Sequence, residues 1–543
     1  MGCDVAPGSP GDLRPVFSVD TQELLDEDIG QDLSAQGLKV QRRIHQLELE
    51  ISALKNRQNI LRCPLNRMLP PELLLRIFLL HPASTGKSKR VHLSHVCRQW
   101  RYIALESGAF WGDLLFTTTE MTELMLTRSK KALLTARCDK LDWRHREIIA
   151  TILSQRGRLH TLEISGPDDI LPPFEPARPQ MARFLKSLSL TKISIPVWKS
   201  LPLGPSVTEL RLDCPTGTNR PTVEELFGSL SEMPLLSTLH LSHLLPKAAP
   251  GHTDWTKKPL SLTNLRELRL QDISTRVNHF LESVDISYFA TVFVDIDDAT
   301  IIRESLNTLI DVLGVSWSLD EEHPCRWDDE DFHVQEISIE NFNSGTSVHS
   351  IHQPSIAMAF SAETVPDLTV SFRRPWITSS VAATTFLAVL DVKLNLTQTL
   401  LYTNLNSCDQ LNGRIWDQLG SFDNLKTVTF TKSPVYEAFF SNSVLVIEGS
   451  DDISPEDYFI SLSTITLMEC DLGRNATNDD VLTIIGEYLA IRADESDLDL
   501  TLEITECRNF DEEGFNEIKG PYPRTKVVWD YFEDMSEDGS DSE

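Results

Sequence analysis

The sequence has little positive charge for its length and no long apolar run. Of its 543 residues, 50 are Lys or Arg and 80 are Asp or Glu, so the formal net charge is −30 at pH 7. This shortage argues against general nucleic-acid binding, because phosphate backbones are held by basic surface. No stretch approaches the roughly 18 consecutive apolar residues that a transmembrane helix needs, so we expect no membrane partner.

The nine cysteines show no pairing pattern. None forms a C-x-x-C motif, and an odd, scattered set is typical of reduced thiols rather than of a disulfide framework or a zinc site. The N-terminus lacks the basic and apolar regions of a secretory signal. Gly2-Cys3 is compatible with acylation, but Ala6 stands where myristoylation prefers Ser or Thr. We therefore predict an intracellular protein, cytoplasmic or nuclear.

Motifs for catalysis and cofactor binding are missing as well. The segment STGKS (84–88) is similar to the end of a phosphate-binding loop, but His81 stands where that motif requires a glycine. His92 and His95 are spaced like metal ligands, yet the residues around them do not complete a four-ligand site. Neither G-x-S-x-G nor H-E-x-x-H occurs. The sequence predicts a protein that is not an enzyme, with no cofactor and no metal.

The first part of the chain combines a polar stretch with a short heptad pattern. Residues 1–36 are rich in Pro, Gly and Asp, and we expect them to be disordered. Residues 37–62 predict a short coiled-coil helix, either dimerising through residues 40–61 or packing back on its own domain. The two apolar heptad positions hold Val40, Leu47, Leu54 and Leu61, and Ile44, Ile51 and Gln58.

Three short apolar helices are expected between residues 64 and 116. LPPELLLRIF (69–78) places two prolines at a helix start, where the first amides lack intrahelical partners anyway. After a polar loop at 81–90, residues 91–107 predict a second helix, and residues 108–116 predict a turn with a third. About fifty residues make a very small core, so such a module often gains stability from a partner.

One apolar pattern recurs through the next part of the chain, residues 117–527. Its copies are LHTLEI (159–164), LKSLSL (185–190), VTELRL (207–212), LSTLHL (236–241), LRELRL (265–270), VQEISI (334–339), LKTVTF (425–430), LSTITL (462–467) and, more loosely, LDLTLEI (498–504). The first five begin 22 to 29 residues apart. That period is similar to leucine-rich repeats, in which each unit supplies one strand. Unrelated strands of an ordinary α/β domain are the alternative.

Not all of this part follows the pattern equally well. Residues 480–492 predict a helical return between strands, with Val481, Ile485, Tyr488 and Leu489 on one face. Copies blur at 274–333 and 344–423, where we expect degenerate repeats or insertions, such as the acidic loop at 320–332. The last residues, 528–543, are mostly acidic and predicted to be disordered. The fold class is therefore α/β overall, a small three-helix module followed by a leucine-rich-repeat-like α/β solenoid.

Residues 69–114 resemble an F-box, in the form common among fungal, basidiomycete-type F-box-like proteins. The matching residues are Leu69-Pro70-Pro71-Glu72-Leu73-Leu74, Ile77-Phe78, Leu93, Val96-Cys97, Trp100-Arg101, Ile103-Ala104-Leu105 and Phe110-Trp111. The segment ESGAFW departs from the family pattern, since many relatives place a proline before the last aromatic pair. The N-terminal coiled coil and the degenerate repeat region resemble that group in arrangement only.

The resemblance implies a docking module. In the family, the Leu-Pro start and the apolar helix faces pack onto the Skp adaptor, which links them to a cullin-based ubiquitin ligase. By family position, the Skp-adaptor contacts are Leu69, Pro70, Leu73, Leu74, Val96 and Cys97. The residues expected to hold the three helices together are Ile77, Phe78, Trp100 and Trp111. The alternative is that all ten form an intramolecular core.

The resemblance further implies a substrate-recognition adaptor that performs no chemistry and holds a target near a ubiquitin-loaded enzyme. The repeat region would bind an unidentified target protein through residues that alternate with the inward leucines. These candidates are Glu163, Glu209, Arg211, His240, Glu267 and Arg269. Their mixed charge favours a protein partner over nucleic acid. A repeat-based interaction scaffold without ligase assembly is the second interpretation.

Overall fold

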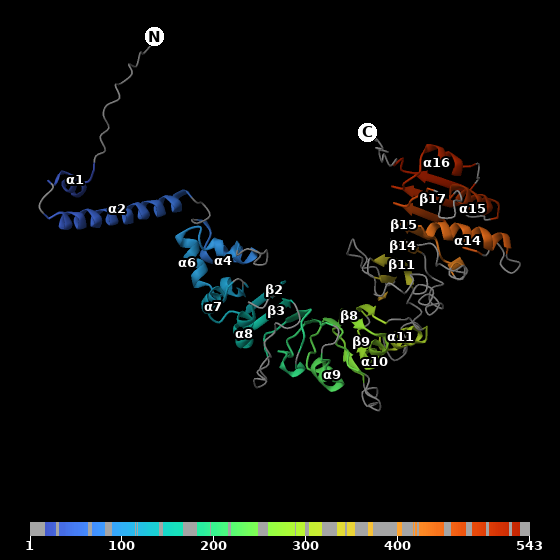
Figure 1. Cartoon of the computed structure of the whole chain (residues 1–543), viewed down its shortest axis with the longest axis horizontal. Helices are drawn as coiled ribbons and strands as arrows, with labels where there is room; N and C mark the ends of the chain where they lie inside the picture. The colour runs from blue at the N-terminus through green and yellow to red at the C-terminus, as the bar shows by residue number, and fades with distance from the viewer. Residues whose placement is uncertain are drawn as a thin grey trace, which may run out of the picture. The chain divides into compact units, whose positions relative to one another are not determined.

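The computed structural model forms two compact units (Figure 1). Unit 1 comprises Met1–Asp113 and Met125–Ala132, and unit 2 comprises Leu114–Leu124 and Leu133–Glu543. The residues that the structure describes are 17–28, 32–62, 68–81, 89–114, 116, 118–140, 145–166, 182–195, 197–215, 219–247, 259–287, 289–298, 303–317, 334–342, 345–352, 368–372, 399–403, 416, 419–420, 423–449, 458–473, 481–495, 499–520 and 524–532. The predicted acidic loop and the residues after 532 lie outside them.

Unit 1 begins with two helices, α1 (Val19–Asp26) and α2 (Leu33–Arg62). The prediction of disorder over residues 1–36 is therefore wrong for α1 and for the start of α2. Arg43 of α2 donates to the hydroxyl groups of Thr21 and Ser18, at 3.0 and 2.7 Å, and so holds α1 against α2. Composition alone could not show this contact, because it joins residues more than twenty positions apart.

A helical module follows, made of α4 (Pro71–Leu80), α5 (Lys89–Leu93), α6 (Arg98–Glu106) and the 3-10 helix η1 (Gly108–Trp111). α4 begins at the predicted prolines. The single helix predicted over 91–107 is instead two helices, because the chain turns at 94–96 and Cys97 is extended (φ −154°, ψ 170°). The Cys97 thiol accepts a hydrogen bond from the Trp100 amide at 3.5 Å, and so caps α6.

Aromatic side chains form the core of this module. Phe78, Phe110 and Trp111 are buried. The ring centroids of Phe78 and Trp100 lie 4.8 Å apart, and those of Phe110 and Trp111 lie 5.2 Å apart in an edge-to-face arrangement that favours aromatic pairs. The Trp111 indole nitrogen donates to the Ala104 carbonyl oxygen at 2.8 Å, so its buried polar atom is satisfied.

A buried arginine joins the segments of the module. Arg90 is 8% exposed and donates to the carbonyl oxygens of Leu79 and His81, at 3.0 and 2.8 Å. It also pairs with the Asp113 carboxylate. The two carbonyls belong to the C-terminal end of α4, where such groups lack intrahelical partners and carry partial negative charge. The predicted polar loop at 81–90 thus ends in a residue of the core.

Unit 2 is built on a 16-stranded sheet with the order β1-β2-β3-β4-β5-β6-β8-β10-β13-β12-β11-β14-β15-β16-β17-β18. Its strands are β1 (Asp113–Leu114), β2 (Leu134–Cys138), β3 (Leu159–Ser165), β4 (Ser187–Thr191), β5 (Glu209–Asp213), β6 (Thr238–Ser242), β8 (Glu267–Asp272), β10 (Thr291–Ile296), β11 (Val334–Phe342), β12 (Gly345–His352), β13 (Leu368–Phe372), β14 (Thr399–Thr403), β15 (Thr427–Thr431), β16 (Thr464–Met468), β17 (Leu500–Thr505) and β18 (Thr525–Trp529). From β2 onward every pairing is parallel except the two made by β12. A second sheet pairs β7 (Leu260–Leu262) with β9 (Val284–Ile286).

The helices between the strands are short. They are α7 (Thr119–Arg128), α8 (Arg146–Ser154), η3 (Arg156–Arg158), η4 (Trp198–Ser200), α9 (Val223–Ser231), α10 (Ser274–Leu281), α11 (Arg303–Ser316), α14 (Val435–Gly449), α15 (Val481–Glu495) and α16 (Glu512–Ile518). The predicted return at 480–492 is α15, and the four residues predicted on its apolar face are all buried. The predicted boundary of the tail at 528 is wrong, because β18 continues to the buried Trp529.

The last four residues of every copy of the repeated pattern lie on a strand, and parallel neighbours match residue for residue. One row across the sheet holds Leu162, Leu188, Leu210, Leu239 and Leu268, all fully buried. A second buried row lies two residues further along each strand, from Ile164 to Leu270. Because side chains alternate along a strand, the residues between these rows point to the opposite face. The predicted inward direction of the leucines is confirmed.

The same turn recurs after strands that are far apart in the sequence. The residues with left-handed backbone directly after β4, β6, β15, β16 and β17 are Lys192, His243, Lys432, Glu469 and Glu506, with φ between 49° and 58°. At four of these turns, the amide of the left-handed residue donates to a carbonyl oxygen on the neighbouring strand. The bonds run from Lys192 to Asp213 (2.7 Å), His243 to Gln271 (2.8 Å), Lys432 to Met468 (3.0 Å) and Glu469 to Thr505 (2.9 Å). These bonds join each strand end to the next.

We expect Arg90→Met to weaken the helical module by about 2–4 kcal/mol, because methionine fills similar space but leaves two carbonyl groups and the Asp113 carboxylate without their charged donor. Hydrogen–deuterium exchange of amides 71–111 in the full chain measures the effect as faster local opening. Arg101→Met is the matched control, since Arg101 is exposed on α6. Equal exchange in the two variants would contradict the role of Arg90.

Candidate functional site

One side of α4 is apolar and exposed. Leu73 is 42%, Ile77 50% and Leu80 82% exposed. They follow one another at spacings of four and three residues, which places them on one side of the helix. Leu74 and Phe78 occupy the opposite side and are buried in the core. We call Leu73, Ile77 and Leu80 the α4 stripe. An exposed apolar surface of this kind marks an interaction site more often than isolated apolar residues do.

The structure divides the residues predicted to contact an adaptor. Pro70, Leu73 and Val96 are exposed, and Leu69 and Cys97 are half-buried. Leu74 is buried, so this predicted contact is a core residue of the chain. The physical reason is the period of the helix, which places Leu74 beside Phe78, four residues later.

The residues predicted to form the core divide in the same way. Phe78 and Trp111 are buried, and Trp100 is half-buried against the Phe78 ring. Ile77 is wrong as a core residue, because the same helical period places it beside Leu73 on the exposed stripe. Ile77 is therefore exposed where the sequence predicted a core residue, and Leu74 is buried where it predicted an adaptor contact.

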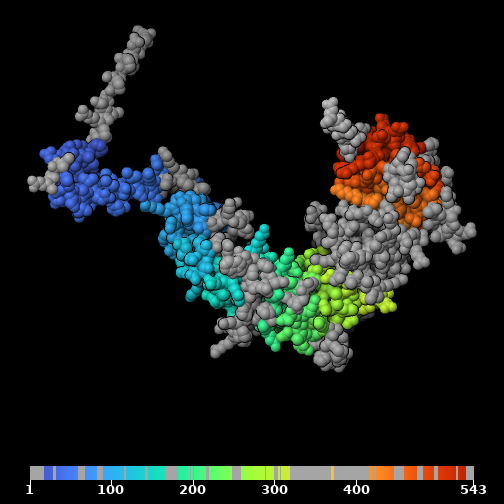
Figure 2. Space-filling model, viewed as in Figure 1, coloured from blue at the N-terminus to red at the C-terminus, as the bar shows by residue number. Residues whose placement is uncertain are grey.

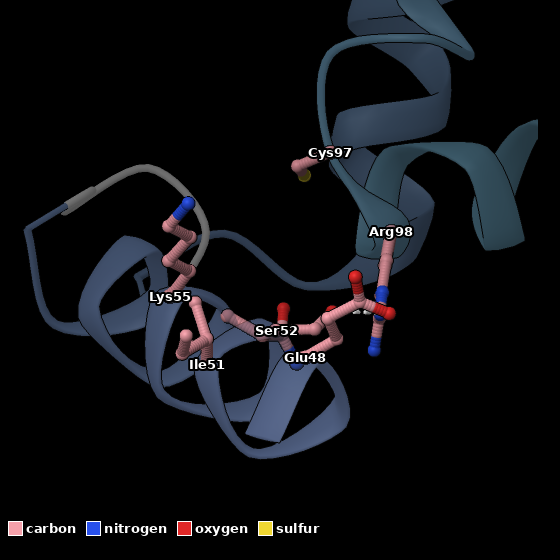
Figure 3. Close-up of a pocket in the computed structure, with 7 residues that line it drawn as sticks. Glu48, Ile51, Ser52, Lys55, Cys97 and Arg98 are labelled. Carbon is pink, nitrogen blue, oxygen red and sulfur yellow. Dashed lines mark hydrogen bonds between the residues drawn. The ribbon is translucent and has the colours of Figure 1, made fainter. Parts of the chain in front are cut away.

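A polar hollow of about 460 Å³ lies between α2 and the start of α6. It is lined by Glu48, Ile51, Ser52, Lys55, Asn56, Cys97 and Arg98. Figure 3 shows Glu48 and Ser52 of α2 directed toward Arg98, which donates a hydrogen bond to the Ser52 hydroxyl. The lining mixes both signs of charge.

The described ranges hold neither a metal-binding cluster nor a membrane-spanning helix. There, no group of three or more His, Cys, Asp or Glu side chains is placed to hold a metal ion. None of the helices in these ranges combines the length and the apolarity that crossing a bilayer requires.

The six residues predicted to bind a target lie on the outward side of the sheet, in two neighbouring rows. Register places Arg211, His240 and Arg269 directly beside one another on β5, β6 and β8. Glu163 of β3 belongs to the same row, and Ser189 of β4 lies between it and Arg211. Glu209 and Glu267 lie two residues earlier on their strands. Neighbouring strands are roughly 4.8 Å apart, so the row is continuous although Arg211, His240 and Arg269 follow one another 29 residues apart in the sequence.

Specific side-chain contacts connect residues within these rows and between them. His240 Nε2 lies 2.8 Å from Glu267 Oε1, and Arg137 Nε donates to Glu163 Oε2 at 2.9 Å. The Arg269 guanidinium lies 4.5 Å from the centroid of the Phe293 ring. Sequence reasoning missed Arg137 and Phe293, because the strands β2 and β10 that carry them do not match the repeated pattern. Only the register with β3 and β8 brings them into the row.

His240 occupies the centre of this row. Burial lowers the pKa of its imidazole below the ordinary value, Glu267 opposes this shift, and Arg211 and Arg269 add to it. His240 is therefore neutral at pH 7. Acidification would add a third positive charge between the two arginines, so the net charge of this surface depends on pH.

We expect acidification from pH 7 to 5 to destabilise unit 2 less in His240→Gln than in the natural chain. The unfolded chain binds a proton on His240 near pH 6.5, whereas the folded chain binds it only at lower pH. Between pH 7 and 5 the unfolded state thus holds more protons than the folded state, so the free energy of unfolding decreases as the pH is lowered. Thermal unfolding at both pH values measures the difference, with His45→Gln on exposed α2 as the control. An unchanged pH dependence in His240→Gln would contradict the assignment.

Comparison with known families identifies a domain in the first part of the chain. A family model described as F-box-like matches residues 67–117, the stretch that contains α4, α5, α6, η1 and the α4 stripe. No curated protein matches the sequence. F-box domains typically bind the Skp adaptor in Skp-cullin-F-box ubiquitin ligases and are generally non-catalytic. The chain therefore carries an F-box-like domain at residues 67–117.

Proposed function

We propose that the chain is a substrate-recognition adaptor of a Skp-cullin-F-box type ubiquitin ligase. The observation that carries this proposal is the α4 stripe, three large apolar side chains left in water on one helix of the F-box-like domain. Full burial of such a side chain contributes about 1.5–3 kcal/mol, so a partner that covers the stripe gains substantial affinity. The Skp-binding surface then comprises Leu73 and Ile77, with Pro70 and Val96 also exposed and Leu69 and Cys97 at its margin.

Unit 2 is proposed to be a leucine-rich-repeat-like solenoid that binds the target. Support comes from the repeated pattern on successive parallel strands, from the residue-for-residue register and from the recurring left-handed turn. In Figure 2 the colour passes in chain order through unit 2 from cyan to yellow, as expected when each repeat contacts mainly its neighbours. The outward row around His240 would contact a target protein of complementary charge.

The proposed mechanism is positional. The F-box-like domain holds the Skp adaptor and, through it, the cullin, while the outward rows of unit 2 hold the target. The chain itself makes and breaks no bond. Its contribution is a high effective concentration of a target lysine near the ubiquitin-loaded enzyme.

A repeat-based interaction scaffold that assembles no ligase is the second candidate. The burial of Leu74 favours it, because one of the contacts expected from the family pattern is not available on the surface. In this case the F-box-like domain would be a small helical cap on a binding array, and unit 2 would keep its partner-binding role.

We expect Leu73→Asp/Ile77→Asp to lower the affinity of the full chain for a purified Skp adaptor by at least about 100-fold, since two carboxylates would have to be buried in an apolar interface. Biolayer interferometry with immobilised Skp adaptor measures the affinity of each variant. With the natural chain, added cullin should form a ternary complex. Leu235→Asp is the matched control, because Leu235 is 54% exposed but lies in unit 2.

Both substituted side chains are exposed in the single chain, so the fold should survive, and hydrogen exchange of residues 71–111 checks it. Equal binding by the double variant and the natural chain would exclude the α4 stripe from the interface. A natural chain that binds neither Skp adaptor nor cullin would overturn the ligase proposal in favour of the scaffold.

A further inference from the structure

α2 leaves a second apolar surface exposed in unit 1. The seam residues Val40, Ile44, Ile51, Leu54 and Leu61 are between 42% and 71% exposed, and Leu47 is half-buried. They recur at alternating spacings of four and three residues, so they stay on one side of a gently supercoiled helix. The side-chain hydrogen bonds to α1 and α6 involve Arg43 and Ser52, which lie beside the seam.

The residue types in the seam indicate how many helices would form the coiled coil. The heptad a positions hold Ile44, Ile51 and Gln58, and the d positions hold Val40, Leu47, Leu54 and Leu61. A β-branched residue at a combined with leucine at d favours two parallel strands, because each shape packs best in the hole that this geometry provides. The seam spans about 32 Å at the rise of 1.5 Å per residue, which is three heptads.

The single polar seam residue decides the orientation. In a parallel, in-register pair, each a residue faces the same residue of the other helix, so the Gln58 amides face and hydrogen-bond one another. In an antiparallel pair an a residue faces a d residue, and every d residue of this seam is apolar. Gln58 would then bury an amide against an apolar side chain, which is unfavourable.

Two of the three flanking charge pairs are attractive in the parallel arrangement, and the third, Arg57 with Arg62, is repulsive. There, a g residue of one helix faces the e residue five positions later on the other helix. Arg43 faces Glu48, and Glu50 faces Lys55, and two-fold symmetry makes each attractive pair occur twice. Arg43 already bonds to α1, so the pair of Glu50 and Lys55 is the one better suited to a test.

We propose that α2 pairs with α2 of a second copy of this chain, as a parallel two-stranded coiled coil in register. The dimer carries two F-box-like domains and two repeat arrays. A target with two recognition sites is then held more tightly than by one chain, because the second contact is intramolecular. This consequence rests on the proposed function, whereas the dimer itself does not.

Light scattering of the full chain, coupled to size-exclusion chromatography, tests the dimer with no other protein present. The natural chain is expected at twice the 61.3 kDa of one copy. Leu54→Asp, at a d position 71% exposed in the single helix, is expected to give monomers. Leu49→Asp is the matched control, since Leu49 lies on the same helix, is 58% exposed and faces away from the seam, so it should stay dimeric.

A charge exchange tests the orientation. Glu50→Lys places two lysines opposite each other twice per dimer and is expected to raise the dissociation constant about 5- to 30-fold in analytical ultracentrifugation, on the scale of exposed ion pairs. Glu50→Lys/Lys55→Glu should restore the natural value only if residues 50 and 55 face one another, as in the parallel pair.

Three results would overturn the proposal. They are a monomeric natural chain at micromolar concentration, equal dissociation by Leu54→Asp and Leu49→Asp, and a double charge variant weaker than Glu50→Lys alone. Skp-adaptor binding by monomeric Leu54→Asp separates this outcome from failure of the proposed function, because the α4 stripe is not altered.

Discussion

The residue-for-residue pairing of parallel strands is the constraint on which unit 2 depends. It aligns the leucines of successive strands into continuous buried rows. No single strand could remove its leucines from water alone, so each depends on its neighbours for burial and for backbone hydrogen bonds. The same alignment makes the outward side chains continuous, and a ladder that stabilises the fold thereby produces an extended surface as well.

Unit 1 is stabilised in a different way. Its helical module has a small aromatic core around Phe78 and Trp111, supported by a buried Arg90 that satisfies the end of α4. A core of this size covers only one side of α4, and nothing in the described part of unit 1 covers most of the α2 seam. Both exposed apolar surfaces therefore result from too few residues to bury them, and a partner chain is proposed for each.

Several features were predictable because they depend on neighbouring residues in the sequence. The alternation of apolar residues predicted the strands, and the prolines at 70 and 71 predicted the start of α4. The burial of Leu74 and the exposure of Ile77 were also present in the helical period, since residue 74 must share a side with Phe78. The break between α5 and α6 was not, because it depends on the extended backbone of Cys97 and its bond to the Trp100 amide.

The local elements, the buried side of each strand and the resemblance to an F-box could all be read from the order of the residues. Which distant residues meet became known from the folded chain alone. Register brought Arg211, His240 and Arg269 together and added Arg137 and Phe293 to their row. Folding likewise brought Arg90 to the end of α4. The reason is that local patterns depend on residues a few positions apart, whereas these contacts depend on how whole strands and helices align.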